Sequence, residues 1–150
     1  MSQINSYLTF DGNCREAMTF YQKCFGGKLF FQTVGESSIA KEMSAEMKNS
    51  ILHGSLVIGE LKLFASDMTP NVGLTRGNTL SIFLECRSAE EIEEYYEKLS
   101  NGGKKEFPLE KTFWGALFGV ITDKFGFHWM LNYDEEVKKA NGEQRTESGK

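Results

Sequence analysis

Two segments of this chain repeat each other at a fixed spacing, and this internal repeat constrains the fold more than any other feature. EAMTFYQK, which starts at Glu16, and EIEEYYEK, which starts at Glu91, lie 75 positions apart. Both carry apolar or aromatic residues at helical spacing, and both are followed by Gly-Gly, which is typical of a helix that ends before a strand. We therefore expect two amphipathic helices in two similar halves.

Each predicted helix has an N-terminal capping signal. Asn13 is expected to cap the first helix, with Glu16 three residues later, and Ser88 begins an S-x-x-E capping box with Glu91. A run rich in β-branched and aromatic residues precedes each helix, INSYLTF in the first half and TLSIFLEC in the second. The order strand then helix is therefore predicted twice.

A hairpin signal follows in each half. Gly59-Glu60 suits a two-residue type II′ turn, and Asp123 to Gly126 suits a type I turn with Asp first and Gly last. One further strand before each hairpin, KLFFQTV and KKEFPLE, completes two βαβββ modules, and Pro108 restricts the second of these strands to an edge or a bulge. The predicted fold class is α+β.

The two hairpins are offset by 67 positions instead of 75, so the first half contains an additional loop of about eight residues. The polar segment Gly35 to Ser50 fits this loop, either as a solvated excursion or as a lid over a pocket. We expect one domain over residues 1–134, with repeat one at about 3–68 and repeat two at about 77–134. The charged segment 135–150 is expected to be a disordered tail.

The composition favours a cytoplasmic protein that binds neither nucleic acid nor membrane. The net charge of −4 comes from scattered residues without a basic patch, no run of 18 apolar residues occurs, and the first residues do not resemble a signal peptide. Cationic partners are mildly favoured by this charge. Cys14, Cys24 and Cys86 lack CxxC spacing and are expected to be reduced packing groups.

Three segments, FDGNCREAMTFYQKCFGG, HGSLVIGELKLFASD and TFWGALFGVITDKFGFHW, resemble the PhnB-like branch of the vicinal oxygen chelate (VOC) superfamily. That superfamily includes glyoxalase I, dioxygenases and bleomycin-resistance proteins. The resemblance implies two βαβββ modules whose mixed sheets curl into a cup, with the helices outside and a cavity inside. It also implies a homodimer and a small-molecule ligand.

The segment from Phe113 to Asp134 holds seven aromatic rings in 22 residues. A strand that starts at Trp114 would place Gly115 and Gly119 on one face, where a neighbouring backbone or a ligand could approach closely. The rings on the other face could line a cavity, although ordinary core packing explains each ring taken singly. The candidate ligand-binding residues are Tyr7, His53, Trp114, Phe118 and His128, with the two histidines as polar handles.

Metal-dependent members of the superfamily take ligands from the first and last strands of each repeat. This chain offers few such residues there, and the weak candidates for a three-ligand site are His53, Glu85 and His128. Imidazole and carboxylate would suit Zn²⁺, Mn²⁺ or Fe²⁺, but nothing in the spacing requires a metal. No GxSxG elbow, P-loop or GxGxxG follows a strand, and no glycine-rich loop is placed to hold a methyl-donor nucleotide.

Three hypotheses remain open from the sequence. The first is a metal-free binder of a cationic, partly aromatic small molecule. The second is a divalent-metal-dependent enzyme, either a glyoxalase-like lyase or isomerase or a dioxygenase. The third is an interaction module whose aromatic faces serve only dimerisation.

Overall fold

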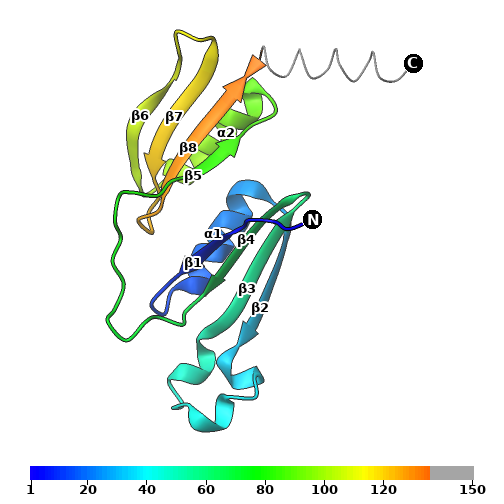
Figure 1. Cartoon of the computed structure of the whole chain (residues 1–150), viewed down its shortest axis with the longest axis vertical. Helices are drawn as coiled ribbons and strands as arrows, with labels where there is room; N and C mark the ends of the chain where they lie inside the picture. Colours follow the sequence, from blue (N-terminus) through cyan, green and yellow to red (C-terminus); the bar gives the residue numbers. More distant parts are fainter. Residues whose placement is uncertain (136–150) are drawn as a thin grey trace, which may run out of the picture. The chain divides into compact units, whose positions relative to one another are not determined.

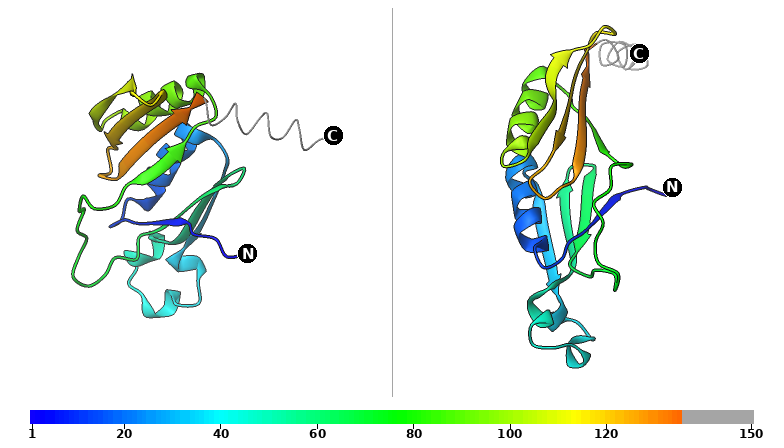
Figure 2. Two further views of the ribbon diagram at one scale, coloured as in Figure 1. Left: turned by 45° about the horizontal axis from the view of Figure 1, so that its top comes forward. Right: turned by 90° about the vertical axis from the view of Figure 1, so that its left-hand side faces the viewer.

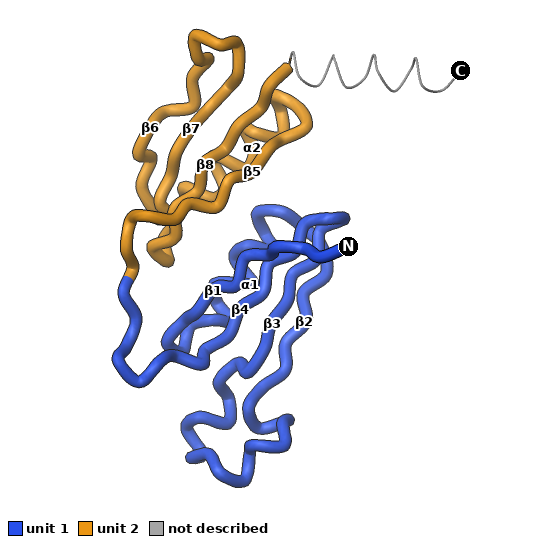
Figure 3. The backbone as a smooth tube through the Cα atoms, in the orientation of Figure 1, with its two compact units in different colours: residues 1–75 blue, residues 76–150 orange. Residues whose placement is uncertain are grey.

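The computed structural model of the chain describes residues 1–135 and consists of two compact units, residues 1–75 and residues 76–150 (Figure 3). The boundary falls between the two sequence repeats. The predicted tail 135–150 lies outside the described residues except for Glu135. No helix within residues 1–135 has both the length and the apolar character needed to cross a membrane.

Unit 1 is a four-stranded sheet with one helix (Figure 1). Its elements are β1 (Ser6–Thr9), α1 (Cys14–Phe25), β2 (Lys28–Thr33), β3 (Ile51–Ile58) and β4 (Leu61–Ser66). The strand order is β1-β4-β3-β2, in which β1 pairs with β4 in parallel and the other pairs are antiparallel. The short strand β1 therefore lies at one edge and β2 at the other.

Unit 2 repeats this arrangement. Its elements are β5 (Ile82–Glu85), α2 (Ala89–Ser100), β6 (Lys104–Lys111), β7 (Ala116–Thr122) and β8 (His128–Asp134). The order β5-β8-β7-β6, again with a parallel first pair, matches that of unit 1 strand for strand. The predicted α+β fold of two βαβββ modules with mixed sheets is confirmed.

Each helix covers one face of the sheet in its own unit, as the right-hand view of Figure 2 shows. The side chains beneath α1 and α2 are almost fully buried, and they alternate along the strands with more exposed ones, as a pleated sheet requires. The buried strand residues are Leu8, Leu56, Leu63 and Ala65 in unit 1, and Leu84, Ile121, Trp129 and Leu131 in unit 2. The face opposite the helix is left uncovered within each unit, and we call it the open face.

The helix caps differ between the two units. Ser88 caps α2 as predicted, because its hydroxyl accepts the Glu91 amide at 3.0 Å. Asn13 occupies the N-cap position of α1, but its side chain makes no capping hydrogen bond, so that prediction is wrong. The buried carboxylate of Asp67, which follows β4, accepts the Cys14 amide instead, at 2.9 Å. A residue 53 positions away in sequence therefore caps α1.

The turns of both hairpins are as predicted. Gly59 has φ +58°, and no described non-glycine residue has positive φ, which fits a type II′ turn at Gly59-Glu60. In unit 2 the Gly126 amide donates to the Asp123 carbonyl at 2.9 Å, which closes the predicted four-residue turn. The expected additional loop contains three short 3₁₀ turns, at Val34–Glu36, Ala40–Glu42 and Met47–Asn49.

Strand β7 begins at Ala116 and not at Trp114 as the sequence suggested. Thr112 closes a turn over Phe113 to Gly115, in which Gly115 has φ +91°. Gly115 therefore serves the turn. Gly119 does allow a close approach, but the neighbour is the ring of Tyr96 on α2, which a Cβ at this position would meet at 2.7 Å.

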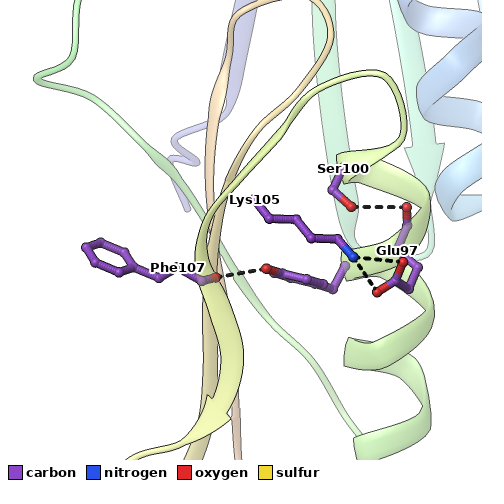
Figure 4. A network of polar contacts seen from close by, with 5 residues as sticks. Glu97, Ser100, Lys105 and Phe107 are labelled. Atoms are coloured by element: carbon purple, nitrogen blue, oxygen red, sulfur yellow. Dashed lines mark hydrogen bonds and ion pairs between the residues drawn. The ribbon is translucent and has the colours of Figure 1, made fainter.

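A polar network fastens α2 to the edge strand β6 (Figure 4). Lys105 contacts both carboxylate oxygens of Glu97, at 2.9 and 3.2 Å, and the Tyr96 hydroxyl donates to the Phe107 carbonyl at 2.9 Å. Pro108 lies in this edge strand within a register irregularity between Phe107 and Glu110, as predicted. The hydrogen bond from Tyr96 satisfies a carbonyl in the irregular stretch of the ladder.

Candidate functional site

The open face of unit 1 displays its side chains in rows that cross the four strands. Strand register defines the central row, which we call the ring row: Tyr7, Phe64, Ser55 and Phe30. On one side of it, Thr9 pairs with Ser66 and His53 pairs with Gln32, and we call these four residues the polar row. On the other side, Val57 pairs with both Lys62 and Lys28, which form the lysine row.

Two of the predicted ligand-binding residues meet on this face. The ring centroids of Tyr7 and His53 lie 6.3 Å apart, and the His53 imidazole stacks on Phe64 with centroids 5.7 Å apart and an interplanar angle of 26°. Tyr7 is 53% exposed, whereas His53 and Phe64 are half-buried. These three side chains form one continuous aromatic surface, which we call the ring cluster.

His53 is the polar group of the ring cluster. Neither imidazole nitrogen has a hydrogen-bonding partner among residues 1–135. Every fully buried side-chain nitrogen or oxygen in that range does have a partner, so the two nitrogens of His53 must reach solvent. A half-buried imidazole can both donate and accept a hydrogen bond. It therefore offers a ligand a directional contact beside two stacking surfaces.

The corresponding positions in unit 2 carry no such group. The Phe10 amide donates to the Ser66 carbonyl and the Cys86 amide donates to the Asn132 carbonyl, so these two strand pairs are in equivalent register. On this basis Phe83, Met130 and Phe118 occupy the places of Tyr7, Phe64 and His53. The cluster in unit 2 is therefore entirely apolar.

The other three predicted residues all lie in unit 2. Phe118 is half-buried on the open face of that unit. Trp114 lies in the turn before β7 and is 52% exposed, and its ring meets that of Phe113 edge to face, with the ring centroids 4.7 Å apart. His128 lies 3.0 Å from the Thr122 hydroxyl through Nδ1 and 3.0 Å from the Gly77 carbonyl through Nε2. Both nitrogens of His128 are thus already engaged, unlike those of His53.

The structure does not assemble the suggested metal ligands. Within residues 1–135 no group of three His, Cys, Asp or Glu side chains could hold a metal ion. Glu85 and His128 share the open face of unit 2. Glu85 pairs with Asn132, which is four positions after His128 on β8, so about 13 Å separates the two candidates along the strand. His53 lies in the other unit. The donor set therefore does not fit a transition-metal site, and we derive no chemistry through one.

The first and last strands of each module explain this result. Where the superfamily resemblance implies ligands, the open faces present Tyr7 beside Phe64 in unit 1 and Phe83 beside Met130 in unit 2. Phenyl and phenol rings and a thioether are not ligands that Zn²⁺, Mn²⁺ or Fe²⁺ prefers. The residues present at these positions favour stacking over coordination.

Two hollows on the outer surface of unit 2 are less suited to a ligand. They have volumes of about 490 and 510 Å³ and share Glu97 and Lys105 as lining residues. Each opens widely around the ion pair between those two side chains. None of the five predicted ligand-binding residues lines either hollow.

The cysteines are free and buried, as predicted. Burial raises the pKa of the Cys14 and Cys86 thiols to about 12, and the neighbouring carboxylates of Asp67 and Glu91 respectively contribute to this rise. A thiol that stays protonated at neutral pH is a poor nucleophile. Neither of these two cysteines is therefore a candidate for covalent catalysis.

Sequence reasoning missed Phe64, the third member of the ring cluster. Its signal was present in β4, where Leu61, Leu63 and Ala65 alternate with Lys62 and Phe64. The buried face at Leu63 and Ala65 implies that Phe64 points the other way. Only the parallel pairing of β1 with β4 shows that Tyr7 is its neighbour.

The sequence profile of the 3-demethylubiquinone-9 3-methyltransferase family matches residues 2–132 of this chain. The chain belongs to this family. A curated relative, protein YjdN of Escherichia coli (strain K12), is 31% identical, and the match covers 86% of this chain and 93% of YjdN. The predicted PhnB-like branch is therefore confirmed at the level of family.

Solved structures of similar proteins share the fold of this chain. The crystal structure of PA1353 from Pseudomonas aeruginosa has a TM-score of 0.79 at 39% identity, over 89% of this chain and 98% of that one. A PhnB protein from Bacillus cereus, described with the same family name, has a TM-score of 0.66 at 23% identity, over 88% and 99%.

A member of the wider superfamily shares this fold. A glyoxalase/bleomycin resistance protein/dioxygenase family enzyme from Burkholderia phytofirmans has a TM-score of 0.58 at 14% identity, over 85% of this chain and 96% of that one. At this identity the likeness shows the fold alone. The expected VOC fold is confirmed, and it leaves the activity of this family member to be argued from its own residues.

Proposed function

We propose that this family member binds a small molecule containing a planar ring, without a metal, and that the ring cluster of Tyr7, His53 and Phe64 is its contact surface. The observation that carries this proposal is the state of His53, which is half-buried against two rings and has no hydrogen-bonding partner among the described residues. Because its nitrogens reach solvent, a ligand on the two rings can replace water as their hydrogen-bonding partner.

The chemistry of the cluster is recognition by stacking plus one directional hydrogen bond. Tyr7 and Phe64 supply ring surfaces for an offset or edge-to-face contact, and His53 fixes the orientation of the ligand. Trp114, Phe118 and His128 remain predicted contributors from unit 2.

The family name refers to a methyltransferase, and we do not extend that activity to this chain. The methyl-donor nucleotide that such an enzyme uses carries a carboxylate, and a helix N-terminus commonly binds an anionic group of this kind. In residues 1–135 the amide of Cys14 at the start of α1 is bonded to Asp67, and that of Glu91 in the first turn of α2 is bonded to Ser88. A metal-dependent lyase, isomerase or dioxygenase is the alternative function, and a dimerisation module is the third hypothesis.

Two further proposals accompany the binding function. We propose that the protein is a homodimer, since each unit has an open face with exposed aromatic residues, such as Phe30 and Phe83, that its own helix does not cover. We also propose a cytoplasmic location, which is supported by three buried cysteines that form no disulfide bond.

The test is a thermal-shift and calorimetric titration with three naphthalene compounds of matched shape: 2-naphthoate, 2-naphthamide and 2-naphthylmethylammonium. A ligand at a hundredfold excess over its Kd should stabilise the protein by about 2.7 kcal/mol. Replacing His53 by Phe keeps the stack and removes the hydrogen-bonding atoms, so it should weaken binding about tenfold. Tyr7→Leu should also weaken binding, because it removes a stacking surface.

Phe107→Leu is the matched control, since Phe107 lies in unit 2 and is 63% exposed. If none of the three compounds binds, or if Phe107→Leu weakens binding as much as His53→Phe, the ring cluster is not the site. Turnover that appears only after Ni²⁺, Mn²⁺, Zn²⁺ or Fe²⁺ is added, and that is lost in Glu85→Ala, would favour the metal-dependent alternative.

A further inference from the structure

The sheet of unit 1 is cationic although the chain as a whole is acidic. The four strands β1 to β4 contain no Asp or Glu, while they carry Lys28, Lys62 and His53. The full chain has 21 acidic and 17 basic residues, for a net charge of −4. The charge next to the ring cluster is thus opposite in sign to the average on which the expectation of a cationic ligand was based.

Both lysines point to the open face. Val57 pairs with Lys62 on one side and with Lys28 on the other, and it belongs to the same alternating set as Ser55 and His53 on β3. Lys62 is two residues from Phe64 on β4, which places their Cα atoms about 7 Å apart. A long lysine side chain can span such a distance to an anionic group attached to a ring on the cluster.

Neither ammonium group has an ion-pair partner among residues 1–135. In unit 2, by contrast, Lys98, Lys104 and Lys105 all pair with glutamates. Lys28 and Lys62 form no such pair, even though Glu60 lies in the adjoining turn. Two unpaired cations beside an aromatic surface offer charge complementarity to an anionic ligand.

Two of the acidic groups that flank these strands are occupied by the fold, whereas Asp11 and Glu60 are exposed. Asp67, at the end of β4, accepts the amides of Gly12, Cys14 and Ile51 through its two oxygens. Glu36, after β2, accepts a hydrogen bond from the Thr33 hydroxyl. Neither carboxylate is placed to attract a cationic ligand to the ring row.

We propose that the open face of unit 1 selects a planar aromatic anion, such as an arene carboxylate. The ring rests on Tyr7 and Phe64, His53 bonds to one edge, and the anionic group lies against Lys62 with Lys28 beside it. This inference rests on the proposed function and adds the charge of the ligand to it.

The three naphthalene compounds named above test the charge directly, because they share one ring system and differ in charge. At low ionic strength 2-naphthoate should bind tightest, 2-naphthamide less tightly and 2-naphthylmethylammonium weakest. Lys62→Met should weaken binding of 2-naphthoate about fivefold and leave 2-naphthamide unchanged, and Lys28→Met should do the same to a smaller degree. Added salt should weaken only the anion.

Lys23→Met is the matched control, since Lys23 is an exposed lysine in the last turn of α1, outside the sheet. It should leave all three affinities unchanged. Equal binding of the three compounds would leave the proposed function standing and overturn the anion preference. Absence of binding by all three would overturn both.

Two further outcomes would overturn this assignment of the anion site. One is a preference for 2-naphthoate that survives in Lys62→Met and in Lys28→Met. The other is a change in sedimentation velocity in those variants without any change in binding, which would show that a second copy of the chain covers the lysine row.

Discussion

Replacing Asp67 tests whether a single buried carboxylate holds three segments of unit 1 together. Asp67 is 5% exposed. Its Oδ1 accepts the amides of Gly12 at 3.0 Å and Cys14 at 2.9 Å, and its Oδ2 accepts the amide of Ile51 at 2.8 Å. It therefore joins the end of β4 to the start of α1 and the start of β3.

The magnitude follows from the number of bonds that each substitution removes. A hydrogen bond to a charged group contributes about 1.5–3 kcal/mol, and an amide left without a partner adds a desolvation cost. Asp67→Asn keeps one oxygen, which can serve Gly12 and Cys14, but it turns an NH₂ group toward the Ile51 amide. We expect a loss of about 2 kcal/mol for Asn and about 4 kcal/mol for Ala, where all three bonds are removed.

The assay is urea unfolding followed by circular dichroism, with the midpoint and the slope fitted separately. A loss of about 2 kcal/mol should lower the midpoint by about 1 M. Two controls isolate the role of Asp67. Asp11→Asn changes an exposed aspartate in the loop between β1 and α1, and Asn13→Ala removes the residue that the sequence suggested as the cap. The free energy of unfolding of both variants should stay within about 0.5 kcal/mol of wild type.

Two results would refute this account. The first is an Asp67→Asn variant as stable as Asp11→Asn, which would mean that the three bonds contribute nothing net. The second is an Asn13→Ala variant that loses as much stability as Asp67→Asn, which would show that the Asn13 side chain caps α1.

Three further predictions concern the packing of the units. Gly119→Ala should destabilise the protein by about 1–3 kcal/mol in urea unfolding, because the new Cβ would lie 2.7 Å from the Tyr96 ring; a neutral effect would show that the ring moves freely. Tyr96→Phe should cost about 1 kcal/mol, through loss of the bond to the Phe107 carbonyl, and an unchanged midpoint would contradict that role. Cys14 and Cys86 should resist a thiol reagent at pH 8 in the folded protein. Burial raises the pKa of each thiol from 9.0 to about 12, so the thiols of the unfolded chain ionise at lower pH than those of the folded protein. The stability that the two thiols contribute should therefore be complete below pH 9 and fall as the pH rises toward 12. Equal urea midpoints at pH 8 and pH 10 would contradict this.

The sequence predicted the fold well because the two repeats carry local signals for every element. Helical spacing, Gly-Gly ends and hairpin turns each depend on residues a few positions apart, so they can be read without knowing which strands pair. The Ser88 cap and the edge position of Pro108 were correct for the same reason. These are local rules that the fold did not override.

The errors arose where a contact that the residue pattern does not reveal decided the local structure. Asn13 looked like a cap, but its side chain makes no capping hydrogen bond, and Asp67, which follows β4, accepts the Cys14 amide. Trp114 continued an apolar alternation, but Thr112 closes a turn around it, so β7 starts two residues later. His128 stays a predicted ligand-binding residue, but the sequence did not show that both of its ring nitrogens already contact Thr122 and Gly77. Two of these contacts, Asp67 with Cys14 and His128 with Gly77, join residues more than 50 positions apart, which no local pattern can show.

The comparison of the two units indicates which half is suited to recognition. Their backbones have the same strand order and register, yet the cluster positions hold Tyr7, Phe64 and His53 in one unit and Phe83, Met130 and Phe118 in the other. A fold that requires an apolar surface at these positions explains the second set. It does not explain an imidazole with both nitrogens unbonded among the described residues.

The lysine row differs between the units in the same way. In unit 1 Lys28 and Lys62 form no ion pair within residues 1–135. Strand register places Lys104 and His128 at these positions in unit 2, where Lys104 contacts Glu106 and His128 contacts Thr122 and Gly77. At these positions unit 2 pairs its polar groups internally, while unit 1 leaves polar and cationic groups available beside aromatic rings. These groups reach solvent and bond to no other described residue, so their concentration on one face of unit 1 supports a ligand that replaces water as their partner.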